Sequence, residues 1–334
     1  MKKITLITFF TLFACLCFSQ NNVLKAAFDV RKISFTKWDT HNGILYTQVP
    51  GANLGPTSFE VLDKNRIAFL CNSSNEIIVI SSTNGEVISR FPVEFAPRDF
   101  SYDRGQYYIL SEFNVDIYDE SGKIVNNLSF SNTHVGIERI TRFNNSTFLL
   151  LPSGNSLMIE SNGKPIEPKK IDGWITSSGY RVVSKISGSN TYNVTLYSLS
   201  GVKSDCEFRT EKAVAGVFVI GTSSNRVLLD VQTYLSENPI SVERKIVSVG
   251  ISDSCLNKIV TEIVIPNVYY VLSNKDFSVS PQGQTYNMIT TPKGVFIFSL
   301  SEPESEKEVI HPYPDFITKE SYQFNDHLLK VEEN

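Results

Sequence analysis

The hydrophobic pattern of the chain consists of short apolar runs separated by polar turn residues. In residues 57–93, four runs at 57–62, 66–71, 76–81 and 86–93 are rich in β-branched and aromatic residues. Asn, Asp, Ser and Gly, which favour turns, separate these runs. No apolar stripe of helical periodicity continues for three turns. The pattern therefore predicts an all-β chain.

A glycine-containing turn signal marks a repeat in this pattern. Asn or Ser precedes Gly43, Gly85, Gly122, Gly163 and Gly201. The signal recurs about every 40 residues, a period typical of repeat proteins. Glycine supplies the positive φ that tight hairpins require. Four predicted strands in each period indicate the blade of a β-propeller, with the glycine turn between its last two strands.

The repeat predicts six complete four-stranded blades and two half-blades at the chain ends. The complete blades are expected at 57–93, 96–135, 136–172, 173–213, 214–268 and 269–316, with an insertion near 232–239. Residues 318–331 resemble a first and second strand, and residues 32–49 resemble a third and fourth. Pairing these N- and C-terminal strands would close the ring and remove free sheet edges. The pattern favours seven blades, with six as the alternative if the C-terminal segment only caps the ring.

The first 20 residues have the layout of a secretory signal peptide. Lys2 and Lys3 precede an uncharged, mostly apolar run at 4–13, and cleavage is expected near Ser19 or Gln20. A lipid anchor at Cys15 is the alternative. No later stretch reaches the about 20 apolar residues that span a membrane. We therefore expect an exported protein, periplasmic or extracellular, with a single propeller domain over residues 21–334.

Cysteines and charge narrow the class of protein. The predicted mature chain keeps Cys71, Cys206 and Cys255, an odd number that excludes a closed disulfide framework. Buried free thiols are the preferred interpretation, and a Cys206–Cys255 bond is left open. The net charge is −4, and removal of the leader leaves 29 basic against 35 acidic residues. Nucleic acid is not an expected partner, because phosphate binding requires a basic stripe.

Two segments resemble known propeller families. Residues 55–70 are similar to the start of an NHL-type repeat. Residues 280–286 resemble the Ser-Pro-Asp-Gly turn of TolB-like and YVTN-type propellers, with Gln282 in place of the usual Asp. The resemblance implies a bacterial extracytoplasmic propeller. Families of this kind mostly bind proteins, peptides or glycans, and a minority are enzymes.

Propeller ligands usually lie over the central channel, so the loops at its mouth hold the candidate binding residues. Loops before the first strands and between the second and third strands supply amide, charged and aromatic groups that suit a polar ligand or a peptide. The ligand-binding candidates are Asn72, Asn75, Arg98, Asp99, Glu112, Phe113, Arg139, Trp174, Lys275 and Asp276. The alternative is that each is an ordinary solvated loop residue.

Catalytic signatures are absent from the sequence. The four histidines are scattered and form no zinc motif, and no Gly-x-Ser-x-Gly nucleophile elbow occurs. The sequence thus predicts no catalytic residue, no metal site and no cofactor. The expected function is binding or scaffolding of a protein, peptide or glycan. The alternative is a lactonase or glycan-cleaving enzyme that uses channel-mouth carboxylates such as Asp99, Glu112 and Asp276.

Overall fold

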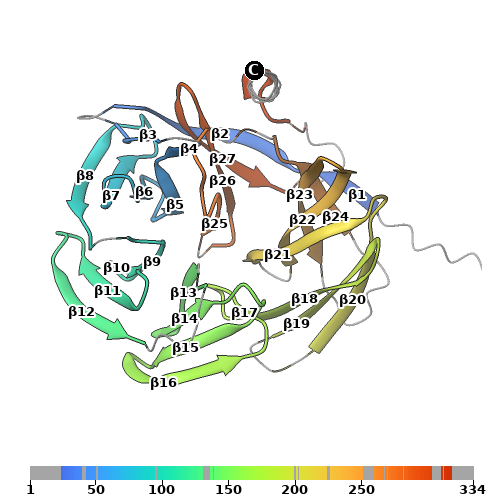
Figure 1. Cartoon of the computed structure of the whole chain (residues 1–334), viewed down its shortest axis with the longest axis horizontal. Helices are drawn as coiled ribbons and strands as arrows, with labels where there is room; N and C mark the ends of the chain where they lie inside the picture. The colour runs from blue at the N-terminus through green and yellow to red at the C-terminus, as the bar shows by residue number, and fades with distance from the viewer. Residues whose placement is uncertain are drawn as a thin grey trace, which may run out of the picture.

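The chain folds into β-sheets arranged around a central axis (Figure 1). The computed structural model describes residues 24–39, 43–49, 52–94, 96–130, 136–137, 139–198, 201, 203–223, 226–250, 259–266, 268, 270–280, 282–302, 310 and 312–317. Within these residues, five sheets have four strands, one has five and one is a two-stranded hairpin. The six larger sheets are the blades of a β-propeller, numbered here 1 to 6 in chain order.

Blades 1 to 4 are antiparallel sheets of four consecutive strands, as the turn pattern predicts. Blade 1 contains β5 (Pro56–Val61), β6 (Arg66–Cys71), β7 (Glu76–Ser81) and β8 (Val87–Pro92). Blade 2 contains β9 (Asp99–Asp103), β10 (Gln106–Leu110), β11 (Asn114–Asp119) and β12 (Ile124–Ser129). Blade 3 contains β13 (Arg139–Phe143), β14 (Ser146–Leu150), β15 (Ser156–Ser161) and β16 (Lys164–Ile171). Blade 4 contains β17 (Trp174–Ile175), β18 (Arg181–Gly188), β19 (Thr191–Tyr197) and β20 (Lys203–Arg209).

The last two blades each include a strand from the N-terminal region. Blade 5 contains β21 (Val214–Ser223), β22 (Arg226–Glu237), β23 (Ile240–Gly250) and β24 (Ile259–Val264), with β1 (Leu24–Ala27) parallel to β24. Blade 6 contains β25 (Phe277–Val279), β26 (Thr285–Thr291) and β27 (Gly294–Ser301), with β2 (Asp29–Lys37) antiparallel to β27. The separate hairpin pairs β3 (Thr47–Val49) with β4 (Ala52–Leu54).

The prediction of seven blades is wrong, and the alternative of six is correct. Residues 32–37 were expected in a seventh blade, but they belong to β2, the outermost strand of blade 6. The described residues after 268 give blade 6 three strands, β25 to β27, and β2 pairs with the outer edge of β27 as the fourth. Phe35 of β2 stacks on Phe296 of β27, with ring centroids 4.4 Å apart. The predicted C-terminal half-blade at 318–331 lies outside the described residues.

The predicted glycine turns are confirmed in four blades. Gly85, Gly122, Gly163 and Gly201 each lie between the third and fourth strands of a blade, with φ between 73° and 83°. At Gly85 a side chain is also excluded by space, because a Cβ there would lie 2.0 Å from the carbonyl oxygen of Phe35. Glycine at this position therefore lets blade 1 pack against β2.

The hydrophobic core lies between neighbouring blades. Phe59 and Phe69 of blade 1 belong to a buried cluster with Met288 and Ile297 of blade 6. Similar clusters lie between blades 1 and 2, 2 and 3, 4 and 5, and 5 and 6. Inner strands such as β6 and β7 thus contribute apolar side chains to both neighbouring interfaces, which is why their apolar runs are nearly continuous.

Cysteine pairing differs in part from the preferred interpretation. Cys71 is a buried free thiol, as expected, and burial raises its pKa well above the usual value. Cys206 of β20 is disulfide-bonded rather than free. Cys255 lies outside the described residues. Over the part of the chain that is described, no helix combines the length and the apolar composition that a membrane crossing requires.

Candidate functional site

A cavity of about 460 Å³ opens where the inner strands of the later blades begin. We call it the mouth cavity. Blade 3 contributes Arg139, the first residue of β13, and blade 4 contributes Trp174, the first residue of β17. Blade 5 contributes residues of β21 to β23, and blade 6 contributes the segment that leads into β25. Its volume is within the range of small-molecule and peptide sites.

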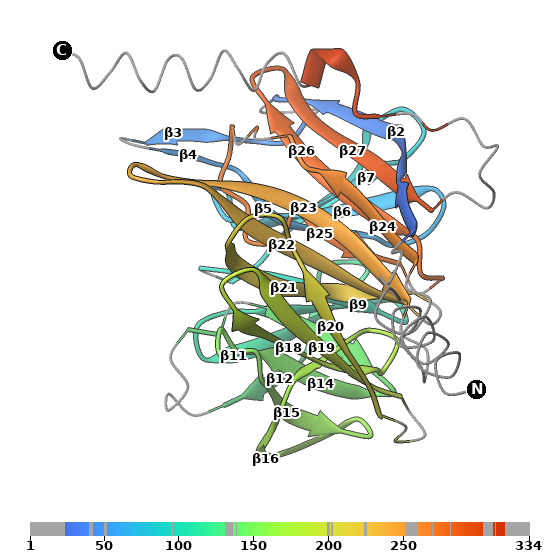
Figure 2. The same ribbon diagram turned by 90° about the vertical axis from the view of Figure 1, so that its right-hand side faces the viewer.

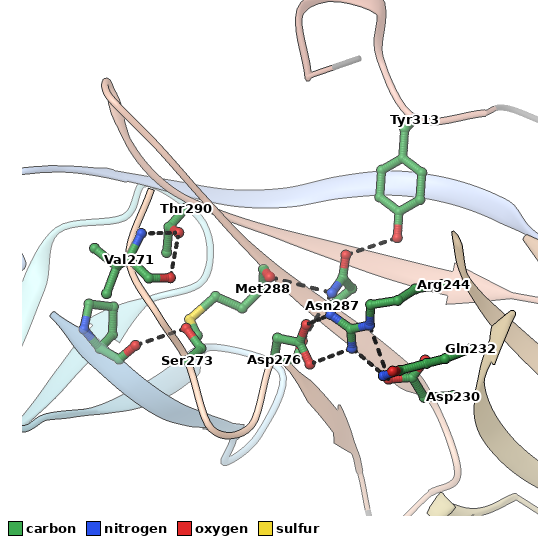
Figure 3. Close-up of polar contacts among 11 residues, drawn as sticks. Asp230, Gln232, Arg244, Val271, Ser273, Asp276, Asn287, Met288, Thr290 and Tyr313 are labelled. Atoms are coloured by element: carbon green, nitrogen blue, oxygen red, sulfur yellow. Dashed lines mark hydrogen bonds and ion pairs between the residues drawn. The ribbon is translucent and has the colours of Figure 1, made fainter. Parts of the chain in front are cut away.

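An ionic group from two blades forms one wall of this cavity (Figure 3). Asp230 and Gln232 are two residues apart on β22 and therefore share a face, and Arg244 is the cross-strand partner of Gln232 on β23. The Arg244 guanidinium donates to Asp230 Oδ2 at 2.7 Å and to Asp276 Oδ2 at 2.8 Å. Arg244 therefore joins blade 5 to the loop that precedes β25 in blade 6.

Buried hydrogen bonds hold Asp276 in position. Asn287 of β26 donates from Nδ2 to the backbone carbonyl of Asp276 at 3.0 Å. Tyr313 donates its hydroxyl hydrogen to Asn287 Oδ1 at 2.9 Å. Burial raises the pKa of Tyr313 well above its usual value, so this hydroxyl stays a neutral donor. The Asp276 side chain is thus presented to the cavity on a fixed backbone.

The loop before Asp276 is anchored to blade 1 and to β26. Ser273 donates from Oγ to the Pro56 carbonyl at 3.1 Å, and the Val271 backbone N–H donates to Thr290 Oγ1 at 3.0 Å. The backbone N–H of Asn274 donates to the Thr57 carbonyl at 2.8 Å. These bonds give the cavity a rigid floor built from loop residues.

Arg139 and Trp174 are lining residues of the mouth cavity and of a second cavity. The guanidinium carbon of Arg139 lies 5.3 Å from the Trp174 ring centroid, a cation–π arrangement. Both residues also line the second cavity, of about 220 Å³, which we call the inner cavity. Trp174 Nε1 is buried and has no hydrogen-bond partner among the described residues.

The inner cavity is lined by a different ionic group. Lys275 donates from Nζ to Glu60 Oε1 at 2.8 Å and to the Phe100 carbonyl at 3.1 Å, and its Nζ lies 3.5 Å from Asp99 Oδ1. Burial raises the pKa of Glu60 above its usual value, against the opposing attraction of Lys275. Lys275 and Asp276 are adjacent, and their side chains line different cavities.

The sequence-predicted residues fall into three groups. Arg139, Trp174 and Asp276 line the mouth cavity, and Lys275 lines the inner cavity, where it approaches the buried Asp99. Arg98 and Glu112 form an ion pair with 3.8 Å between their charged atoms. Asn72, Asn75 and Phe113, together with Arg98 and Glu112, are not among the described lining residues of either cavity.

Sequence reasoning missed the residues that come from strands rather than loops. Asp230, Gln232, Arg244 and Asn287 lie inside β22, β23 and β26. The available signal was polar residues in alternate positions of an otherwise apolar run, at 227–233. Within the described chain, no group of three or more His, Cys, Asp and Glu residues is placed to hold a metal ion.

Comparisons with known proteins concern the fold. No protein-family model matches the chain, and no curated protein matches its sequence. Similar solved structures include hydrazine synthase from Kuenenia stuttgartiensis, 11% identical with a TM-score of 0.48 over 75% of this chain and 76% of that one. Streptogramin B lyase is 9% identical with a TM-score of 0.41, over 83% and 98% of the two chains. BamB from Moraxella catarrhalis is 11% identical with a TM-score of 0.33, over 58% and 67%. The assignment to the β-propellers rests on the sheet order of the chain itself.

Proposed function

We propose that this chain is an exported, non-catalytic binding propeller that holds its ligand in the mouth cavity. The observation that carries the proposal is that the acidic side chains in this cavity are already ion-paired. Both acidic side chains among the described lining residues, Asp230 and Asp276, are ion-paired with Arg244. Apolar side chains such as Val268 and Val271 form much of the remaining wall. Fixed polar groups in an apolar cavity are typical of binding sites.

Export is supported by two features of the chain. The leader has two lysines followed by an apolar run, which is the layout of a signal peptide. Cys206 is disulfide-bonded, and disulfides persist in oxidising compartments such as the bacterial periplasm. We therefore propose a periplasmic or extracellular location.

A catalytic role has less support. General acid–base catalysis by channel-mouth carboxylates requires a carboxyl group that can exchange a proton with a substrate. Asp276 is held by Arg244, and Asp99 is buried near Lys275. Both are therefore placed as partners of a cation in the folded protein.

Peptide and glycan arrays, probed with the purified mature chain, test the proposal. We use two variants that add the same ring, Gln232→Tyr inside the mouth cavity and Gln106→Tyr on β10, which is not among the described lining residues of either cavity. Binding should fall at least tenfold in Gln232→Tyr and stay unchanged in Gln106→Tyr. Bound molecules should be recovered chemically intact.

Three outcomes would contradict the proposal. One is a blank array, and another is equal loss of binding in both variants. The third is release of a cleaved product, which would favour the enzyme. N-terminal sequencing of the native protein tests export separately, because a chain that retains Met1 has not lost a leader.

A further inference from the structure

Arg139 places a positive charge at the mouth cavity, and no carboxylate of the described residues forms an ion pair with it. Within the described residues, its side chain has no hydrogen bond or ion pair, and its only described interaction is the stacking on Trp174. The guanidinium group is always protonated and has a planar set of donors that fits a carboxylate. A cation held in a cavity without a partner favours an anionic ligand group.

Blades 5 and 6 place the opposite charge in the same cavity. Arg244 is a single cation between Asp230 and Asp276, so this group keeps one negative charge in excess. The hydrogen bonds that Asp230 accepts from Arg244 and Gln232 all end on its Oδ2. Asp230 Oδ1 is buried and has no hydrogen-bond partner among the described residues. Leaving such an acceptor unpaired is costly, and a ligand N–H that reached this oxygen would satisfy it.

An apolar surface lies between the two charges. Phe218 of β21 lines the cavity and is 47% exposed, although it is a large aromatic residue. Gly216 leaves room for this ring, since a Cβ there would lie 2.6 Å from it. Trp174 of the intervening blade 4 also lines the wall. An aromatic or aliphatic group of a ligand would cover these rings.

We propose that the mouth cavity recognises the C-terminal end of a peptide whose last residue is apolar. Its carboxylate binds Arg139, its side chain packs on Phe218, and a backbone N–H is donated to Asp230. This inference rests on the proposed binding function and names the ligand class. It follows from the separation of the charges, because Arg139 belongs to blade 3 and Asp230 to blade 5. A peptide end carries all three complementary groups, an anion, an N–H donor and a side chain.

The rim of the cavity suits a longer chain that enters end-on. The hairpin of β22 and β23 continues beyond Gln232 and Arg244 and projects from the propeller (Figure 2). Near its tip, Leu235 is 52% and Ile240 is 77% exposed. Residues of the peptide upstream of its C-terminus would contact these side chains.

Acetylated random tripeptides, made with either a free or an amidated C-terminus, test this inference. The two pools are incubated with the purified mature chain, and retained peptides are identified by mass spectrometry. We expect retention from the free-acid pool only, with an apolar last residue. For the best peptide, calorimetry should show at least tenfold weaker binding after amidation. 3-Phenylpropanoate, a carboxylate without an N–H, should also bind at least tenfold more weakly.

Variants assign the contacts. Arg139→Gln should weaken binding of the free-acid peptide at least tenfold, so that the free-acid and amidated peptides bind with equal affinity. The matched control is Arg181→Gln, which removes an arginine that stacks on Tyr197. Neither Arg181 nor Tyr197 is among the described lining residues of either cavity. This variant should bind the peptide like the wild type. Phe218→Ala should weaken peptides with an apolar last residue but not those that end in alanine. Unfolding temperatures confirm that each variant is folded.

The outcomes separate this inference from the proposed function. Equal retention of the two pools overturns the role of the carboxylate. If the glycan or longer-peptide array still binds, the binding function survives that failure. The inference is also overturned if the protein retains peptides from neither pool. Equal affinity of 3-phenylpropanoate would replace the peptide with a small organic acid.

Discussion

Two of the ionic groups in the propeller share a composition but differ in their surroundings. Each consists of one cation and two carboxylates, and the two groups meet at the neighbouring residues Lys275 and Asp276. Lys275 joins blade 6 to Glu60 of blade 1 and Asp99 of blade 2. Arg244 joins Asp230 of blade 5 to Asp276 of blade 6. Both groups thus cross blade boundaries near the axis.

Burial distinguishes the two groups. In the first group the side chains of Lys275, Asp99 and Glu60 are 9%, 0% and 19% exposed. In the second group those of Arg244, Asp230 and Asp276 are 16%, 9% and 21% exposed, so the second group is somewhat more open. A buried charge loses hydration, so the loss of its partner is costly. A charge at a cavity wall keeps some water and can change partners. We infer that the Lys275 group chiefly holds the blades together, whereas the Arg244 group is the one that the proposed function places beside the ligand.

The largest effect is expected from Lys275→Met. The substitution leaves the buried Asp99 and the partly buried Glu60 without their cation, and breaking a buried pair in this way costs about 3–5 kcal/mol. Urea denaturation measures the change in the free energy of unfolding. Lys185→Met, at an exposed position of β18, should change it by less than about 0.5 kcal/mol. Equal stability of the two variants would show that the Lys275 group contributes no more than a surface lysine.

A smaller loss is expected from Arg244→Met. The substitution removes charge-assisted hydrogen bonds to Asp230 and Asp276, which are worth roughly 1.5–3 kcal/mol. Partial exposure of Asp276 lets water replace part of this interaction. The same urea titration, with Arg209→Met at an exposed position of β20 as the control, measures the effect. A loss larger than that of Lys275→Met would reverse the comparison.

The blades were predictable because their signals are local. Turn glycines such as Gly122 and short β-rich runs mark each hairpin, and these depend on neighbours in the sequence. The count of blades depends instead on which partner the open edge of β27 selects. β2 is separated from β27 by most of the chain, so no local signal distinguishes a third strand of one blade from a fourth of another. The assignment of residues 32–37 to a seventh blade was therefore wrong, although the predicted strand itself is present as part of β2.

The candidate site was predictable only in its loop residues. Arg139, Trp174 and Asp276 come at the start of inner strands, and the propeller architecture brings such positions to one end of the axis. Arg244 lies within a long strand, and only its pairing opposite Gln232 places it in the cavity. Lys275 and Asp276 differ because their side chains line different cavities. The sequence shows only that the two residues are neighbours in a loop, so it does not predict this difference.

The smallest effect concerns the pH dependence that Glu60 contributes. Burial raises its pKa above the usual 4.5, so the folded protein binds this proton more tightly than the unfolded chain. The stability that Glu60 adds relative to Glu60→Gln should be greatest below pH 4.5 and should decrease as the pH rises through the folded-state pKa. Glu120→Gln is the control, and its contribution to stability should change with pH in the opposite direction. The reason is that hydrogen bonds from Tyr102 and Arg66 lower the pKa of Glu120. Its contribution should be lost as the pH falls. Urea titrations between pH 4 and 8 measure both, and a Glu60 contribution that increases with pH would mean that the attraction of Lys275 outweighs burial.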